Sequence, residues 1–337
     1  MTAPRGESLV TRWTRRAVTI PGTLAAAITL FALLPLLAPL AALADALRGS
    51  RFAALRGLLA VASYLGCELV GLAACAALWF VGLIDAERAM RGNFRLQCLW
   101  ASALFGAARL LFGLRVAVGG ADVVAGGPVL VLLRHASVVD TLLPAVLISR
   151  RAGLRLRYVM KRELLWDPCL DVAGQRLPNA FVRRGSGDGA AEIARVRELA
   201  SGLGRDEGVV ICPEGTRYTP ERRRQVLARL AETAEPKLVE RARALQNLLP
   251  PRFGGVAALL DAAPEADVLL CVHTGFEGVR GLGDLWSGAL VGRPIQVQFW
   301  RLPAASIPRE PAARLDWLFE QWQRLDAWLE ARPGASA

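Results

Sequence analysis

Three stretches near the start of the chain are far more apolar than the rest. Residues 17–44 form a run of 28 residues without a charge, and residues 57–84 form a second run of 28 that only Glu68 interrupts. A helix of about 20 residues crosses the hydrocarbon core of a bilayer, so both runs are long enough to span it. Residues 98–114 are too short and too interrupted by charge to span. We expect there an interfacial or core-packing helix that joins the anchor to the rest.

The short link between the two long runs, residues 45–56, predicts a helical hairpin. A cleaved signal peptide is the competing interpretation, because arginines precede the first run. We favour an anchor, since the run is too long for a signal peptide and no polar cleavage region follows. Glu68 is interpreted either as a polar contact between helices or as the mark of a partly inserted helix, and we favour the second. The distribution of arginines around the hairpin only weakly favours a topology in which both of its ends face the cytoplasm.

From residue 114 onward the pattern changes to short apolar runs that alternate with helical segments. This alternation favours an α/β sheet flanked by helices. The final segment places five large apolar residues on one face of a helix, which predicts a docking helix or a membrane-surface helix. We therefore divide the chain into an N-terminal membrane anchor, residues 1–92, and a globular domain with a C-terminal amphipathic helix, residues 93–333. The predicted strands are 114–118, 128–133, 156–160, 208–212, 267–272 and 295–300, and the predicted helices are 141–151, 189–203, 221–234, 237–248, 254–263 and 312–331.

Composition narrows the possible chemistry. The 337 residues are 53% hydrophobic, which excludes a disordered chain, and contain only two His, so the candidates for a neutral-pH base are His135 and His273. The six Cys form no CxxC or CxxH pair, so we expect neither a metal site nor a disulfide framework. The net charge of +11 lacks an aromatic-interleaved basic face, and we expect no nucleic-acid partner. Oligomeric state is left open.

The strongest candidate for chemistry is HASVVD, residues 135–140. It follows a predicted strand and precedes a predicted helix, which is where open α/β sheets place their sites. A turn there can fold the carboxylate of Asp140 back onto the His135 imidazole, which would fix its tautomer and leave the other nitrogen as a general base. Ser137 is a candidate nucleophile, but only two residues from His135 it is better interpreted as a turn or cap residue.

Two more segments carry candidate binding residues. CPEGTR, residues 212–217, also follows a predicted strand; Gly215 allows close backbone approach, and the planar fork of Arg217 suits a phosphate. The alternative is an ordinary strand-end turn with a solvated arginine. Arg183 and Arg184 precede a Gly-rich turn, where surface charge is the default interpretation and a second phosphate-binding arm is the functional one.

His-x4-Asp, an apolar block ending in Arg, and Pro-Glu-Gly-Thr-Arg about eighty residues after the His stand in the order found in the 1-acylglycerol-3-phosphate acyltransferases. The chain resembles this family from about residue 98 to residue 301. VMKRELLWDP, residues 159–168, is similar to the Lys-x-Glu-Leu segment of the family. LLPPRFGG, residues 248–255, is loosely similar to a Leu-Leu-Pro-Arg segment of one branch.

The resemblance implies a role for each matching residue. His135 would be the general base and Asp140 its partner. The acceptor phosphate and glycerol would be bound by a further set: Arg184, Glu214, Gly215, Thr216 and Arg217, with Arg183, Lys161 and Ser137 as secondary candidates. Three departures put the acceptor in doubt. Arg134 replaces the usual Asn before the His, Arg183 replaces an Asp, and the fourth motif lacks its Pro around His273, which either lines the pocket or is a core histidine.

The resemblance also implies a glycerolipid-acyltransferase-like fold and a membrane enzyme of phospholipid biosynthesis. It would move an acyl group from acyl-CoA or acyl-carrier protein to a lysophospholipid, with 1-acylglycerol-3-phosphate as the favoured acceptor and no cofactor. We expect a bacterial inner-membrane protein with its catalytic domain on the cytoplasmic side, in contact with membrane lipids. The alternatives are another acceptor (another lysophospholipid, glycerol-3-phosphate or an amino-acid lysolipid) and a non-enzymatic lipid-binding protein. A transporter is disfavoured, because two spans are too few.

Overall fold

The computed structural model describes residues 7–182, 189–277, 279 and 281–332. The chain divides into two compact units, each made from several chain segments. The predicted division between residues 92 and 93 falls inside a helix, α3. The first unit takes residues 1–114, 160–184 and 282–293, and the second takes residues 115–159, 185–281 and 294–337.

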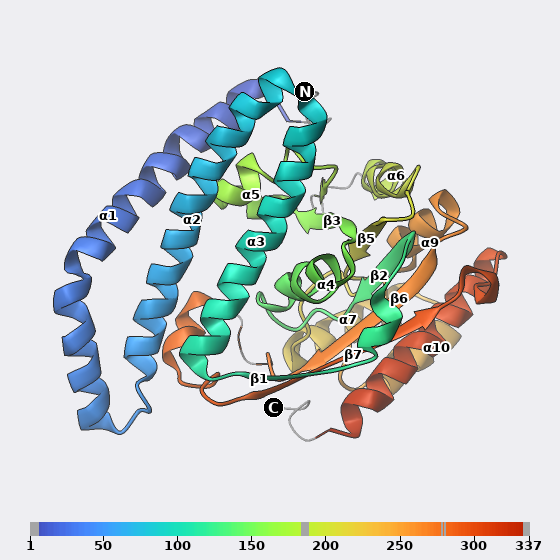
Figure 1. Ribbon diagram of the computed structural model, residues 1–337. Coiled ribbons are helices and arrows are strands. Elements are labelled where there is room, and N and C mark those ends of the chain that lie inside the picture. The colour runs from blue at the N-terminus through green and yellow to red at the C-terminus, as the bar shows by residue number, and fades with distance from the viewer. Residues whose placement is uncertain (1–6, 183–188, 278, 280, 333–337) are drawn as a thin grey trace. The chain divides into compact units, whose positions relative to one another are not determined.

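Three long helices dominate the first unit: α1 (Leu9–Arg48), α2 (Ala53–Ile84) and α3 (Ala86–Phe112). They run side by side in Figure 1, where α2 packs against both α1 and α3. The predicted hairpin is formed, and Asp45 closes it by accepting hydrogen bonds from the backbone N–H groups of Ala54 at 3.1 Å and Leu55 at 2.8 Å.

By length and composition α1 and α2 can each cross a membrane. Both expected apolar runs lie inside these helices, and α1 contains Pro21, Pro35 and Pro39. Large apolar side chains stay exposed along both helices, among them Ile28 (69% exposed), Leu36 (59%) and Val70 (70%). An apolar surface of this kind is unfavourable in water, so the two helices are consistent with membrane association.

Glu68 is a polar contact between helices. Its carboxylate accepts a hydrogen bond from the indole N–H of Trp100 on α3 at 3.0 Å and one from the backbone N–H of Cys169 at 3.0 Å. Cys169 belongs to the short helix α5 (Pro168–Val172), and the hydroxyl of Tyr64 donates to Asp167 just before it at 2.8 Å. Glu68 is fully buried, so its side chain pairs within the first unit. Whether α2 is only partly inserted in a membrane stays a prediction.

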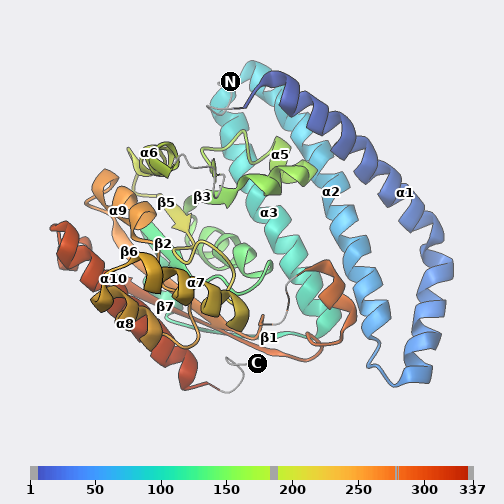
Figure 2. The ribbon, with the colours of Figure 1, turned by 180° about the vertical axis from the view of Figure 1, so that it is seen from behind.

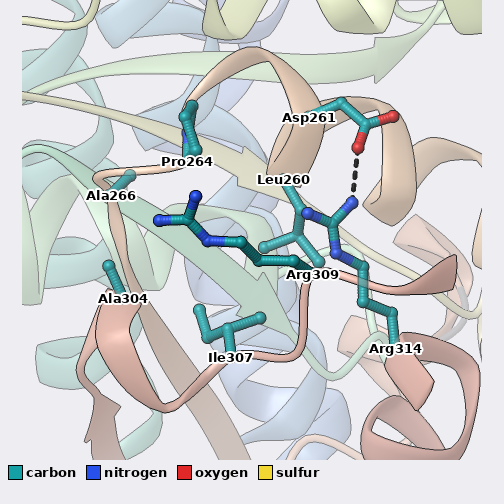
Figure 3. A pocket seen from close by; sticks show the side chains of 8 residues that line it. All are labelled: Leu260, Asp261, Pro264, Ala266, Ala304, Ile307, Arg309 and Arg314. Carbon is teal, nitrogen blue, oxygen red and sulfur yellow. Dashed lines mark hydrogen bonds and ion pairs between the residues drawn. The ribbon is translucent and has the colours of Figure 1, made fainter.

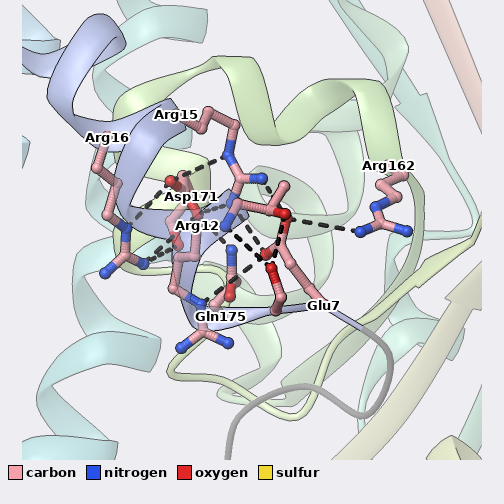
Figure 4. Close-up of polar contacts among 9 residues, drawn as sticks. Glu7, Arg12, Arg15, Arg16, Arg162, Asp171 and Gln175 are labelled. Atoms are coloured by element: carbon pink, nitrogen blue, oxygen red, sulfur yellow. Dashed lines mark hydrogen bonds and ion pairs between the residues drawn. The ribbon is translucent and has the colours of Figure 1, made fainter.

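The amino end of α1 is joined to α5 by ion pairs around Asp171 (Figure 4). The Asp171 carboxylate is fully buried and accepts from Arg15 at 2.8 Å and from Arg16 at 3.1 Å. Arg15 in turn donates to Glu7 at 3.1 Å. A buried carboxylate is tolerated when it is paired and hydrogen-bonded in this way. These two arginines, which the sequence places before the first apolar run, therefore make specific contacts within the first unit.

The sheet of the second unit confirms all six predicted strands. They are ordered β1-β7-β6-β2-β5-β3 and are parallel except for β6 with β7. The bounds are β1 Arg115–Gly119, β2 Val129–Leu133, β3 Arg155–Lys161, β5 Glu207–Ile211, β6 Asp267–Thr274 and β7 Pro294–Leu302, and the short strand β4, Ala180–Val182, lies in the first unit. Every residue of β2 is buried, as expected for a strand covered on both faces.

The helices of the second unit follow the prediction with one difference. Residues 140–152 are helical without a gap, but the helix type changes from a 3₁₀ turn to a π-helical segment that begins at Pro144 and ends in one short α-helical turn, α4. Pro144 lies at the start of the π-helical segment, where its missing backbone N–H is tolerated. The α-helices are α4 Arg150–Ala152, α6 Gly189–Ala200, α7 Pro220–Thr233, α8 Pro236–Ala244, α9 Phe253–Ala262 and α10 Pro311–Glu330. Short 3₁₀ or π segments are Ala121–Val124, Asp140–Leu142, Pro144–Ser149 and Ala304–Ser306 here, with Arg162–Trp166 and Leu282–Trp286 in the first unit.

The C-terminal helix α10 docks on its own unit. Leu318, Trp322, Leu325 and Leu329 of the predicted apolar face are all fully buried, and α10 packs against α9 and β6. Figure 2 shows α8 and α10 side by side, with ion pairs from α8 to Asp316. Of the two predicted roles, docking is therefore the one that the structure confirms.

Candidate active site

His135 and Asp140 lie together at the carboxyl end of β2. The turn after this strand folds back as expected, and the Nδ1 atom of His135 lies 3.1 Å from a carboxylate oxygen of Asp140. The ionised carboxylate of Asp140 can only accept hydrogen bonds. Nδ1 of His135 therefore carries the ring hydrogen, and Nε2 has the free lone pair. The His135 side chain is 11% exposed and that of Asp140 is fully buried, so the pair presents the imidazole to solvent and not the acid.

Asp140 is held by the backbone of the same turn. Its second oxygen accepts from the N–H groups of Ala136 and Ser137, each at 2.7 Å, and lies 3.4 Å from Nε2 of His273. Burial by itself raises the pKa of Asp140. The hydrogen bonds and charges of His135 and His273 outweigh it, so the pKa of this carboxyl lies below its usual range.

Ser137 occupies the turn without facing solvent. Its hydroxyl donates to the backbone oxygen of Val279 at 2.9 Å and accepts from the N–H of Val139 at 3.2 Å, and the residue is fully buried. The second bond is local, and the first ties the turn to the segment after β6. They agree with the interpretation of Ser137 as a turn residue rather than a nucleophile.

The CPEGTR segment is bonded directly to the His135 loop. One oxygen of Glu214 accepts from the backbone N–H of His135 at 2.9 Å, and the other accepts from the N–H of Leu249 at 3.0 Å. The backbone N–H of Tyr218 donates to the oxygen of His135 at 2.8 Å. Burial raises the pKa of Glu214 to about 7, against the opposing effects of its two backbone bonds and of the charge on Arg134. The two motifs therefore form one site.

Gly215 allows the tight turn after Glu214. Its φ is +71°, a conformation that suits glycine, and a Cβ built there would lie 2.7 Å from Nε of Arg252. The side chain of Arg252, in the LLPPRFGG segment, thus packs directly against the turn. Thr216 and Arg217 follow on the same turn and are half-buried. The acceptor-binding role of all four motif residues stays a prediction.

The roles of the remaining predicted residues are not tested by the described structure. Lys161 is the last residue of β3 and belongs to the first unit. Arg183 and Arg184 lie outside the described residues. Their roles stay predictions that rest on the family resemblance.

The structure gives specific contacts to two residues that the sequence left without an assigned role, Arg134 and His273. Arg134 is fully buried and donates to Glu277 at 2.5 Å and to the backbone oxygen of Asn247 at 3.3 Å. His273, also fully buried, joins Asp140 from β6. The only signals in the sequence were the departures from the family pattern at Arg134 and at the fourth motif.

A cavity of about 170 Å³ lies at the opposite edge of the sheet (Figure 3). Ala266 on its wall immediately precedes β6, whereas His273 lies near the far end of the same strand. Since β2 and β6 are parallel, the cavity is on the side of the sheet away from His135. It is crossed by the ion pair of Asp261 with Arg314 and belongs to packing between α9 and α10. The candidate active site is therefore identified from the side chains around His135, and this cavity is not part of it.

Comparison with known proteins agrees with the geometry. Residues 115–265 match the model of the Acyltransferase family, and this segment contains His135, Asp140 and the whole CPEGTR motif. Residues 115–265 therefore carry an acyltransferase domain.

The fold is similar to that of a particular solved enzyme. This is the 1-acyl-sn-glycerophosphate (LPA) acyltransferase PlsC from Thermotoga maritima, at a TM-score of 0.51 and 14% sequence identity. The match covers 82% of this chain and 98% of that chain. The predicted family resemblance and the predicted fold class, a helix-flanked α/β sheet with a helical hairpin before it, are thereby confirmed.

Proposed function

We propose that this acyltransferase transfers a fatty acyl group from a thioester to the free hydroxyl of a lysophospholipid. The favoured acceptor is 1-acylglycerol-3-phosphate, which would give phosphatidic acid. The observation that carries the proposal is the pair of hydrogen bonds joining His135 to the Glu214 and Tyr218 segment, because they put a candidate base beside a candidate phosphate-binding turn. The similarity of the fold to an LPA acyltransferase supports the choice of acceptor.

The His135–Asp140 pair would act as the base. Nδ1 of His135 donates to Asp140, so Nε2 takes the proton of the acceptor hydroxyl while its oxygen attacks the thioester carbonyl. The ionised Asp140 stabilises the imidazolium that forms. The tetrahedral intermediate then collapses, the carbon–sulfur bond breaks, and the proton passes from Nε2 to the leaving thiolate. An ester and a free thiol result, with no covalent enzyme intermediate and no cofactor.

The cationic side chains would position the acceptor. Arg217 offers two parallel N–H donors to a phosphate, and Arg184, with Arg183 and Lys161, would complete a basic set for the phosphoglycerol part. Thr216 offers a hydroxyl. Glu214 uses both oxygens on backbone N–H groups, so its contribution would be to hold the turn rather than to bind the lipid. Positioning of this kind lowers the barrier by removing the entropy cost of bringing the reactants together.

The apolar hairpin fits this substrate class. An enzyme whose acceptor and product are both lipids needs access to the bilayer, and α1 and α2 can supply it. The excess of arginine would favour anionic lipid surfaces. We place the protein in a bacterial inner membrane with the catalytic domain facing the cytoplasm, where acyl-CoA and acyl-carrier protein are found.

The test is an acyl-transfer assay on purified protein in lipid vesicles. Palmitoyl-CoA and acylated carrier protein are the donors. Lysophosphatidic acid, lysophosphatidylcholine, glycerol-3-phosphate and an amino-acid lysolipid are the acceptors, with ester and free thiol both measured. We expect phosphatidic acid from lysophosphatidic acid in preference to the other products. His135→Ala should abolish transfer while vesicle insertion and the circular dichroism spectrum stay unchanged.

Each other outcome of this assay decides between the alternatives. A preference for another acceptor would contradict the substrate assignment and keep the reaction type. Full activity of His135→Ala would contradict the proposed base. No transfer with any donor and acceptor, from protein that binds lysolipid, would identify a lipid-binding protein instead.

A further inference from the structure

His273 is a fully buried histidine beside the proposed catalytic pair. It lies near the end of β6, which is parallel to β2, so the two strands bring His273 and His135 to the same edge of the sheet. Its Nε2 atom is 3.4 Å from Oδ2 of Asp140 and 3.3 Å from the backbone oxygen of Arg134. Among the described residues, its Nδ1 atom has no hydrogen-bond partner.

These neighbours define the tautomer of His273. The two atoms near Nε2 are both oxygens that accept hydrogen bonds, so the ring hydrogen belongs on Nε2. A second proton on Nδ1 would be a buried donor without an acceptor, which is costly. The hydrogen on Nε2 of His273 therefore lies between the backbone oxygen of Arg134 and Oδ2 of Asp140.

The acceptor capacity of Asp140 can now be accounted for. Oδ1 faces His135, while Oδ2 accepts from the N–H groups of Ala136 and Ser137 and faces Nε2 of His273. Two backbone N–H groups bond Oδ2, and Nε2 of His273 lies 3.4 Å from the same oxygen. These contacts hold the carboxylate with Oδ1 directed at His135.

We propose, on the basis of the function proposed above, that His273 is a positioning residue of the acyl-transfer reaction. It completes the set of donors on Oδ2, so that Asp140 stays ionised and keeps Oδ1 aligned with Nδ1 of His135. His273 acts through Asp140 and does not contact the substrate.

The charged groups nearby are consistent with this role. Arg134 donates to the backbone oxygen of His273 and pairs with Glu277, which removes both charges from direct competition for Asp140. Glu214 and Cys271 are the other titratable groups that interact with Asp140, and burial raises the pKa of each. Asp140 is thus the group in this cluster that the surrounding donors hold in its charged form.

The first test compares variants of His273 that keep or remove the donor. His273→Gln retains an N–H group at the distance of Nε2, whereas His273→Phe and His273→Asn do not reach Oδ2. We expect kcat to fall about ten- to a hundredfold in His273→Phe and His273→Asn, with the KM for lysophosphatidic acid within twofold of wild type. The acid limb of the pH–rate profile should move to higher pH, because a carboxylate with fewer donors holds a proton on His135 more strongly. His273→Gln should keep most of the wild-type kcat and most of the wild-type pH–rate profile.

The second test does not need turnover. The sequence contains only two histidines, so protein labelled with ¹⁵N-histidine and purified without a histidine tag has just two imidazoles to observe. We expect Nε2 of His273 to carry hydrogen and the signals of the ring to shift in Asp140→Asn. Nε2 without hydrogen, or no response to Asp140→Asn, would overturn the proposal even if wild type proved inactive. Wild-type kcat and pH profile in folded His273→Asn would overturn it as well.

Discussion

The carboxylate of Glu214 accepts a hydrogen bond from the backbone N–H of His135 at 2.9 Å, across 79 residues of sequence. Its second oxygen holds Leu249 in the same way. The contact exists because β2 and β5 are parallel neighbours whose carboxyl ends meet at one edge of the sheet. Glu214 therefore joins three loops of the proposed active site, and its own environment affects both stability and activity.

Replacement of Glu214 should remove a pH dependence of stability. Its pKa is about 7 in the native protein against an ordinary value of 4.5, so the native state binds a proton that the unfolded chain gives up. This contribution is full below pH 4.5 and is lost as the pH rises to about 7, on the order of 3 kcal/mol. We expect the thermal midpoint of wild type to fall relative to that of Glu214→Gln across that window, because glutamine does not titrate. Glu240→Gln, on an exposed face of α8, is the control. A constant difference from pH 4.5 to 8 would contradict the prediction.

Asp140→Asn should damage the chemical step without affecting acceptor binding. An amide can bond His135 through its N–H₂ group, which would place the ring hydrogen on Nε2 and block the base. We expect kcat to fall by about 10²- to 10⁴-fold with little change in KM. Steady-state rates against lysophosphatidic acid measure this, with the exposed Asp122→Asn as a matched control. A loss confined to KM would show that Asp140 serves binding instead.

Arg217→Ala should act mainly on the acceptor. Loss of a charge-assisted bond to phosphate costs about 1.5–3 kcal/mol, which corresponds to a rise of roughly ten- to a hundredfold in KM for lysophosphatidic acid. The KM for the acyl donor should stay near wild type. Arg309→Ala removes an exposed arginine beside the cavity at the opposite edge of the sheet, and it should leave both constants unchanged. Equal effects of the two substitutions would refute a specific phosphate contact.

Gly215→Ala should destabilise the turn by two separable effects. The left-handed φ of +71° costs an alanine about 1–2 kcal/mol, and the new Cβ would lie 2.7 Å from Nε of Arg252. We expect a lower thermal midpoint and lower activity. In the background of Arg252→Ala the contact is gone but the backbone cost remains, so the double variant should recover part of the loss. Full recovery of the thermal midpoint would mean that the backbone conformation costs nothing. No recovery would mean that the contact with Arg252 is irrelevant.

Much of the site was predictable because it depends on local order in the chain. His135 and Asp140 are five residues apart, so one turn after a strand is enough to bring them together, and the sequence shows both the strand and the turn. The helical segment predicted for residues 141–151 is present for an equally local reason, its apolar periodicity, although its helix type changes at Pro144. His273 was different. Whether it lies in the core or beside the proposed catalytic pair depends on the position of β6 next to β2, which no local pattern reveals.

Sequence patterns alone predict the two apolar helices, the six main strands, the acyltransferase motifs and the pairing of His135 with Asp140. All of these follow from hydrophobic periodicity or from residues close together in the chain. Only the tertiary structure decided that Glu214 holds the backbone of His135, that Arg134 is buried against Glu277, and that Asp140 lies between two imidazoles. The physical reason is that a buried polar group must find its partners wherever the strand order places them, and strand order arises from packing of the whole sheet.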